Sequence, residues 1–244
     1  GKLVEAESLL LRTKDAFLSI AGPDHPTTLQ IHYLWASVLL DQNQLTAARK
    51  ALEHSVAAYR RVFGLDHPNT QDALTTLGAL LVRLGEPRAA EPLLRESLET
   101  SRRVSPPGHP QTRHTQMSLG ACLILLRRFE EAEPLLRECL RSHENTQPDA
   151  GLTHDIQTLL GGALLSQKKY AEAEPLLLAG YEGMKQREAT IPEQGKVRLA
   201  EALDRLIELY TATDKPDEVQ KWHAERAMYP PPAASATEKK QIRI

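Results

Sequence analysis

The sequence predicts an all-α fold, a right-handed α-solenoid of stacked helical hairpins. Near-copies of the stretch Leu74–Leu98 recur before and after it at an almost constant interval, and each copy has two amphipathic segments with a break between them. A chain of 244 residues would otherwise suggest one large or two small globular domains. Because internal repetition overrides that expectation, we expect an array that grows in one dimension.

The stretch Leu74–Leu98 shows how one repeat is built. The residues of its first segment that share one helix face, at i, i+3, i+4 and i+7, are Leu74, Leu77, Gly78 and Leu81. The second segment continues at i, i+4 and i+7 with Ala90, Leu94 and Ser97. Between the segments lies Gly85-Glu86-Pro87, where Gly can take the left-handed conformation that ends a helix and Pro suits the first turn of the next. We therefore expect a helical hairpin.

Small residues mark the repeat period. They open the second helices at Ala6, Ala48, Ala90, Ala132 and Ala173, which are 42, 42, 42 and 41 residues apart. Two further sets recur, at Ala36, Gly78, Gly120 and Gly161 in the first helices and at Ser55, Ser97, Cys139 and Gly180 in the second helices. Helices approach closely where no large side chain intervenes, so all three positions are predicted to be helix contacts.

The period divides the chain into repeats. An incomplete first repeat (1–21) matches only the second helix of a hairpin, so we expect a piece of a longer protein that begins inside a repeat. Hairpins are predicted at about 27–63, 69–104, 111–143 and 152–188, with an atypical terminal hairpin at 196–228. The repeat array therefore spans 1–228. Residues 229–244 have no apolar periodicity and are predicted to be a disordered tail.

Three linkers contain a His-Pro pair, with the histidines His25, His67 and His109. Such a series could indicate a metal site, but equivalent positions of stacked hairpins lie roughly 10 Å or more apart, whereas each ligand of a zinc ion lies about 2 Å from it. We interpret the histidines as residues that hydrogen-bond and order the turn. We expect no metal and no cofactor.

The two cysteines, Cys122 and Cys139, are too few for a disulfide framework. Cys139 occupies the step that Ser55, Ser97 and Gly180 fill in other repeats. Burial as a small apolar side chain is therefore a better interpretation than redox chemistry.

The charge balance argues against several kinds of partner. Lys+Arg 30 against Asp+Glu 32 gives a formal net charge of -2, which offers no electrostatic footprint for nucleic acid or an anionic membrane. No run approaches the roughly 18 apolar residues of a membrane span, and the N-terminus lacks the features of a signal peptide. We expect a cytoplasmic protein. Basic doublets at predicted helix ends are interpreted as a solvated face: Arg60-Arg61, Arg102-Arg103, Arg127-Arg128 and Lys168-Lys169.

The repeated residues resemble the tetratricopeptide pattern. Leu74, Leu77, Gly78 and Leu81, followed by Ala90 and Leu94, are similar to Trp-x-x-Leu-Gly-x-x-Tyr and Ala-x-x-x-Phe, with Leu replacing most aromatics. The 42-residue period, the Gly-x-Asp-His-Pro-x-Thr linkers and the Ala-Glu-Pro-Leu-Leu segments resemble the kinesin-light-chain subclass. The segment 160–181 and the final hairpin also resemble the C-terminal repeats of large bacterial serine/threonine protein kinases. The chain itself carries no kinase motif.

The resemblance implies a concave groove, lined by first helices, that holds a peptide. Mapped onto this chain, the groove residues are Gln30, Tyr33, Ser37, Leu40, Asp72, Thr75, Ala79, Val82, His114, Met117, Ala121, Ile124, Asp155, Thr158, Gly162 and Leu165. Such a face could equally serve ordinary packing between helices. The chain lacks the paired Asn residues with which kinesin light chains grip a peptide, and no Lys/Asn carboxylate clamp is recognisable, so the ligands of those families are not carried over.

The sequence therefore predicts a non-catalytic scaffold that binds a protein or peptide segment in this groove. The alternative is the regulatory or substrate-recruiting region of a serine/threonine kinase whose catalytic domain lies upstream. Self-association through the exposed ends of the solenoid is a third interpretation that the sequence leaves open.

Overall fold

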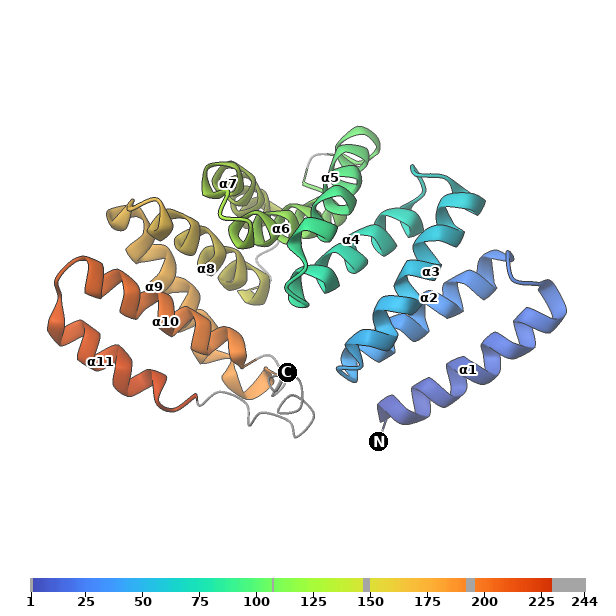
Figure 1. Cartoon of the computed structure of the whole chain (residues 1–244), viewed down its shortest axis with the longest axis horizontal. Helices are drawn as coiled ribbons and strands as arrows, with labels where there is room; N and C mark the ends of the chain where they lie inside the picture. The colour runs from blue at the N-terminus through green and yellow to red at the C-terminus, as the bar shows by residue number, and fades with distance from the viewer. Residues whose placement is uncertain (1, 107, 147–149, 192–195, 230–244) are drawn as a thin grey trace, which may run out of the picture. The chain divides into compact units, whose positions relative to one another are not determined.

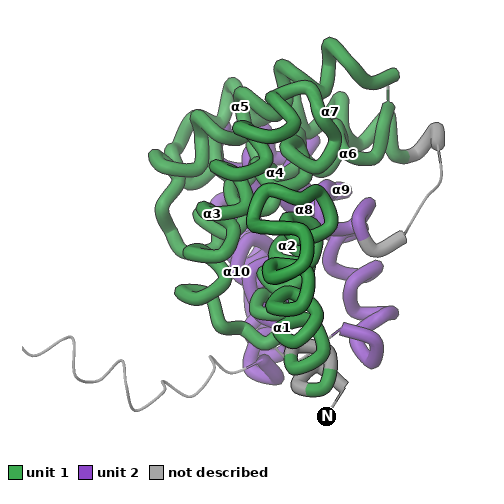
Figure 2. Tube along the Cα trace, turned by 90° about the vertical axis from the view of Figure 1, so that its right-hand side faces the viewer, with its two compact units in different colours: residues 1–146 green, residues 147–244 purple. Residues whose placement is uncertain are grey.

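The computed structural model describes residues 2–106, 108–146, 150–191 and 196–229. It divides into two compact units, residues 1–146 and 147–244 (Figure 2). The division follows Thr146, in the linker that has no His-Pro pair. Apart from Tyr229, the predicted tail lies outside the described residues.

Unit 1 is a stack of hairpins. Its helices are α1 (Lys2–Ala21), α2 (Pro26–Asp41), α3 (Leu45–Phe63), α4 (Pro68–Arg83), α5 (Pro87–Val104), α6 (Pro110–Leu125) and α7 (Phe129–Thr146) (Figure 1). The hairpins are α2–α3, α4–α5 and α6–α7, and each first helix also contacts the second helix that precedes it in the chain.

Unit 2 repeats this arrangement. It contains α8 (Ala150–Ser166), α9 (Tyr170–Gln186), a 3-10 turn η1 (Glu188–Thr190), α10 (Val197–Ala212) and α11 (Pro216–Arg226). Here α8 pairs with α9, α10 pairs with α11, and α10 also contacts α9. The prediction of an all-α fold of stacked helical hairpins is confirmed.

Glycine in the first helix makes room for leucine in the second. A Cβ atom added to Gly78 would lie 2.5 Å from Cγ of Leu94, which is far inside van der Waals contact. The same contact recurs between Gly120 and Leu136 at 2.6 Å and between Gly161 and Leu177 at 2.7 Å. These first-helix positions are therefore close helix contacts, as predicted.

The third small position is also a contact. The hydroxyl of Ser97 lies 2.9 Å from that of Thr75 on the first helix of its hairpin, and the thiol of Cys139 donates to the carbonyl oxygen of Arg113 at 3.3 Å. A Cβ atom at Gly180 would overlap the hydroxyl of Thr158. Side chains longer than these have no space between the helices.

One left-handed residue closes each hairpin. Gly85 has φ 74°, and the amide of Glu86, which follows it, donates to the carbonyl oxygen of Leu81 at 2.8 Å. This six-to-one bond is that of a Schellman motif, which ends a helix. In the other hairpins the left-handed position holds non-glycine residues with φ between 52° and 61°, namely Asn43, Arg127, Lys168 and Asp214.

The linker histidines are helix N-caps. Nδ1 of His25, His67 and His109 accepts a hydrogen bond from the backbone amide two residues later, at 3.2, 3.1 and 3.3 Å. Proline follows each of them at the first helical position, where no amide hydrogen is needed. The predicted role in ordering the turn is confirmed.

Two of the basic doublets connect successive repeats instead of facing only water. Arg60 on α3 pairs with Glu96 on α5, and Arg102 on α5 pairs with Glu138 on α7 at 2.6 Å. The second arginine of each doublet reaches back to the preceding linker, where Arg61 pairs with Asp24 and Arg103 with Asp66. These arginines remain exposed to solvent, as predicted, but the prediction did not include their ion pairs, because it considered each helix end separately from its neighbours.

Candidate ligand-binding face

The first helices of unit 1 lie on the same side of the stack. Figure 1 shows α4 and α6 on the inner side of α5 and α7. Helices α2 and α3 overlap in this view, but the hydroxyl of Tyr33 on α2 lies 2.9 Å from that of Thr76 on α4, so α2 adjoins α4. Helices α2, α4 and α6 carry twelve predicted groove residues. These form four rows, and each row contains one residue from each helix, 42 positions apart. We call these twelve the first-helix face of unit 1: Gln30, Asp72 and His114; Tyr33, Thr75 and Met117; Ser37, Ala79 and Ala121; Leu40, Val82 and Ile124.

Two rows of this face combine small and apolar residues that water still reaches. Leu40, Val82 and Ile124 are all partly exposed, one from each helix. The neighbouring row of small side chains, Ser37, Ala79 and Ala121, is partly exposed as well. Leu125, next to Ile124, is 52% exposed. The structure thus keeps an apolar strip across three helices out of the core.

Tyr33 links two first helices. Its hydroxyl lies 2.9 Å from that of Thr76 on α4. Burial raises the pKa of the Tyr33 phenol, and the nearby carboxylate of Asp72 raises it further. Tyr33 is therefore a neutral, partly exposed side chain whose hydroxyl is held by Thr76. The prediction did not include Thr76, because a pattern of single-helix faces contains no information on contacts between repeats.

Thr75 does not belong to the exposed face. Its side chain is fully buried, and its hydroxyl lies 2.9 Å from that of Ser97 and 2.8 Å from that of Thr115. The side-chain amide of Gln111 also donates to it at 3.0 Å. The assignment of Thr75 to the groove was wrong because its hydroxyl bonds into the contact among α4, α5 and α6.

Asp72 and His114 occupy equivalent positions on neighbouring helices. Burial raises the pKa of the Asp72 carboxyl, although His114 and His109 act against this shift. Burial lowers the pKa of the His114 imidazole, and the charge of Asp72 opposes that change. Each group thus favours the charged form of the other, and together they place an acid and a base at one end of the face.

The four predicted groove residues of unit 2 are not exposed to solvent as the apolar row of unit 1 is. Thr158 and Leu165 are buried, and the Thr158 hydroxyl donates to the carbonyl oxygen of His154 at 2.9 Å. Asp155 pairs with Arg198 of α10 at 2.5 Å. Gly162 is covered by Arg205, whose Nε would lie 3.0 Å from an added Cβ atom. Two arginines of the atypical last hairpin thus cover Asp155 and Gly162, whereas Thr158 and Leu165 are buried, so none of the four is offered as an open surface.

The described residues offer no arrangement for metal chemistry. No group of three or more His, Cys, Asp or Glu side chains among them could hold a metal ion. Both cysteines of the described chain are free and buried. None of the described helices has the length and apolarity required to cross a bilayer. What the geometry provides on the first-helix face of unit 1 is a surface for non-covalent contacts.

Comparison with protein families identifies the repeats. One tetratricopeptide repeat model matches residues 27–103, and a second tetratricopeptide repeat model matches residues 75–145 and 125–186. Together these matches span 27–186, about two thirds of the chain. They concern repeat sequence alone and do not show a relation to protein kinases. No curated protein matches the chain.

Solved structures show the same fold at low sequence identity. BtubC (BKLC) from P. vanneervenii is 15% identical with a TM-score of 0.68, over 97% of each chain. A putative kinesin light chain of Podosopora anserina, with nearly identical TPR-like repeats, is 18% identical with a TM-score of 0.64, over 84% of this chain and 95% of that one. A Rap protein complexed with Competence and Sporulation Factor is 12% identical with a TM-score of 0.64, over 80% of this chain and 53% of that one.

Proposed function

This chain belongs to the tetratricopeptide repeat family, and from that premise we propose that it is a non-catalytic scaffold that binds a peptide or protein segment on the first-helix face of unit 1. The observation that carries this proposal is the partly exposed apolar row of Leu40, Val82 and Ile124. A preformed row of this kind can anchor the apolar side chains of a ligand without a cost for reorganising the scaffold.

The polar rows define the ligand further. Tyr33 can contact an apolar or aromatic side chain with its ring, and Asp72 and His114 can hydrogen-bond the backbone or polar side chains of an extended segment. Within the first-helix face, Thr75 is buried and makes no proposed contact with the ligand, and the four predicted residues of unit 2 are left out because they are buried, paired or covered within the fold. The working compartment that we propose is the cytoplasm, in keeping with two free thiols.

The test is selection of peptides from a random display library on the full chain, followed by fluorescence anisotropy with the selected peptides. The variant Tyr33→Ser/Met117→Ser/Ile124→Ser removes three partly exposed side chains of the face. We expect it to weaken binding at least about tenfold, which corresponds to about 1.4 kcal/mol.

The matched control is Val104→Ser, which removes a 46% exposed apolar side chain at the end of α5, in the other helix layer. We expect this variant to bind like the parent. Selected peptides that bind the triple variant and the parent equally, or a selection that yields no specific peptide, would contradict the proposal.

A further inference from the structure

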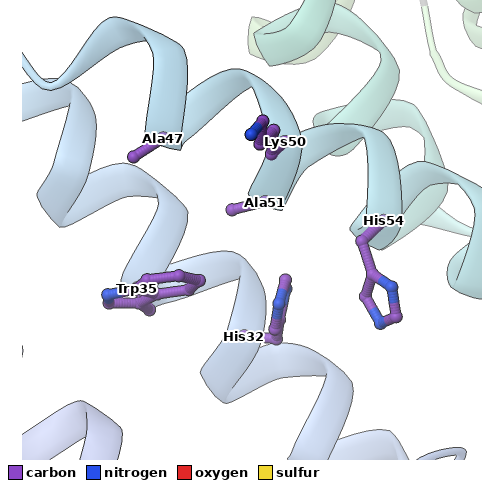
Figure 3. A pocket seen from close by; sticks show the side chains of 6 residues that line it. All are labelled: His32, Trp35, Ala47, Lys50, Ala51 and His54. Atoms are coloured by element: carbon purple, nitrogen blue, oxygen red, sulfur yellow. The ribbon is translucent and has the colours of Figure 1, made fainter.

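A pocket lies between α2 and α3, in the first complete hairpin. It is lined by His32 and Trp35 from α2 and by Ala47, Lys50, Ala51 and His54 from α3, with a volume of about 310 Å³. Figure 3 shows the methyl group of Ala51 pointing from α3 toward the rings of Trp35 and His32. None of these residues belongs to the first-helix face of unit 1.

The repeats themselves show that this pocket is an exception. One period later, leucines stand at the positions of His32, Trp35 and Ala51, namely Leu74, Leu77 and Leu93. Leu74 and Leu77 are buried core residues. Another period later, Leu135 again stands where this hairpin has Ala51. The pocket therefore corresponds to a side chain that the other hairpins possess and this one lacks.

Among the described residues, the ion pairs that connect successive second helices in unit 1 have no equivalent between α1 and α3. Glu96 and Glu138 pair with arginines of the preceding second helix, but the equivalent residue on α3 is His54, and α1 has Leu18 where those arginines would stand. His54 instead packs against His32, with their ring centroids 4.7 Å apart. Where α5 and α7 have a glutamate that pairs with the preceding second helix, α3 thus has the base His54.

Basic groups surround the pocket. Nζ of Lys14 on α1 lies 5.2 Å from the centroid of the Trp35 ring, and Lys50 and His54 are part of the lining. No carboxylate is among the lining residues. In the described chain the nearest acid to Lys14 is its neighbour Asp15, at 4.0 Å, and Lys50 makes no ion pair there. The site thus combines apolar walls with basic groups and has no carboxylate among its described lining residues.

We propose that this pocket binds a carboxylate that is carried by a compact apolar or aromatic body. The ring of Trp35 and the methyl groups of Ala47 and Ala51 would contact the apolar body, while Lys14, Lys50 and His54 would attract the carboxylate. The volume of about 310 Å³ is at the small end of the range for ligand pockets, which suits a single-ring acid.

A ligand of this kind would alter the titration of His32. Burial, His54 from α3 and Lys14 from α1 lower the pKa of the His32 imidazole to about 4, and its Nδ1 lies 3.1 Å from the hydroxyl of Ser55. A bound carboxylate opposes the two nearby bases and so favours the imidazolium form. Binding should therefore raise the pKa of His32 and become tighter as the pH falls from 7 to 5.

Benzoate is a suitable probe for the full chain, with benzamide as its uncharged isostere and inorganic phosphate as an anion without an apolar body. Binding can be followed from the NMR signals of the histidine rings. We expect benzoate to bind in preference to both other probes, and its signal changes to concentrate on His32 and His54. Equal binding of benzamide or phosphate, or no binding of benzoate, would overturn the proposal.

The decisive variant is Ala51→Leu, which fills the pocket with the residue that the next two hairpins carry and should therefore fold. We expect it to weaken benzoate binding at least tenfold. The control, Ala57→Leu, adds the same side chain at an exposed position of α3 and should bind like the parent. Benzoate binding that survives Ala51→Leu, with melting temperatures unchanged, would also overturn the proposal.

Discussion

Leu94 on α5 fills the space that Gly78 on α4 leaves without a side chain. Leu94 is fully buried, and a Cβ atom on Gly78 would lie within 2.5 to 3.3 Å of three of its carbon atoms. In the first hairpin the equivalent residues are Ala36 and Leu52, both fully buried. A methyl group can thus be accommodated at this position when the helices are set for it, but a larger side chain cannot.

We expect Gly78→Leu to destabilise the protein by about 1–3 kcal/mol, because the added side chain overpacks the contact between α4 and α5. Urea denaturation followed by circular dichroism measures the effect. The control is Ala79→Leu, one residue further along α4 and partly exposed, which should change the free energy of unfolding by less than about 0.5 kcal/mol. Equal stability of Gly78→Leu and the parent would show that the helices do not meet as described.

Some hairpin turns contain non-glycine residues in the left-handed conformation, and replacing them with glycine should stabilise the fold. Arg127 and Lys168 have φ 60° and 61°, a conformation that costs a non-glycine residue roughly 1–2 kcal/mol. We expect Arg127→Gly and Lys168→Gly each to stabilise the fold by about 0.5–1 kcal/mol, after allowance for the greater freedom of glycine in the unfolded chain. Asn43→Gly should have a smaller effect, since Asn tolerates this region. Thermal melts that rank Asn43→Gly first would contradict this explanation.

The reverse change tests the same backbone position. Gly85 has φ 74°, and an added Cβ atom would meet no atom within 4 Å. Gly85→Ala therefore introduces backbone strain without a steric clash, and we expect a loss of about 1 kcal/mol in the free energy of unfolding. A stabilised Gly85→Ala variant would mean that the turn is not held in the left-handed conformation.

The repeat architecture could be predicted from the sequence because its signals are local. Gly78, Ala90 and Gly85 each report a contact or a turn inside one hairpin, and the period multiplies that signal. The exposed face was harder to predict. Thr75 shares its helix face with Ala79 and Val82, yet its hydroxyl is buried in a contact with Ser97 and Thr115. Such contacts depend on how hairpins stack, which the helical period alone does not determine.

The terminal hairpin shows the same limit. Nothing in the pattern of α8 indicates that Arg205 lies over Gly162 or that Arg198 pairs with Asp155. These contacts come from the residues of another repeat. The division of the chain after Thr146 coincides with the loss of the His-Pro linker, a difference that the sequence displays but whose structural consequence it does not reveal.

The cysteine thiols should be unreactive in the folded protein. Both are fully buried, and burial raises the pKa of Cys122 to about 11 and that of Cys139 to about 12. Because the thiolate is the nucleophile, we expect less than about a tenth of the thiols to react with a disulfide reagent at pH 8 in the time that complete reaction takes in 6 M guanidinium chloride. Rapid modification of either thiol in the native protein would place it outside the core.

His32 should make stability depend on pH in a defined window. Its pKa is about 4 in the fold, below the ordinary value of 6.5, because burial, His54 and Lys14 disfavour the imidazolium. Above pH 6.5 both the folded and the unfolded states are neutral, so the fold is fully stable with respect to this group. Between pH 6.5 and 4 the unfolded chain binds a proton that the folded chain excludes, so stability falls as the pH falls. Because water screens the charge on the partly exposed ring, the effect is smaller than the full pKa shift implies. We expect the free energy of unfolding to fall by about 1–2 kcal/mol across this window.

The matched variant for this prediction is His32→Leu, which introduces the residue found at position 74 and removes the titrating group. Guanidinium denaturation at pH 7 and at pH 5 should then show a smaller loss of stability than in the parent, whereas His223→Gln, at an exposed position of α11, should retain the parental dependence. The variant leaves all the other histidines in place, so the difference between the two proteins measures the contribution of His32 together with its contact with His54. An identical loss of stability in both would mean that the ring is not kept neutral by its surroundings.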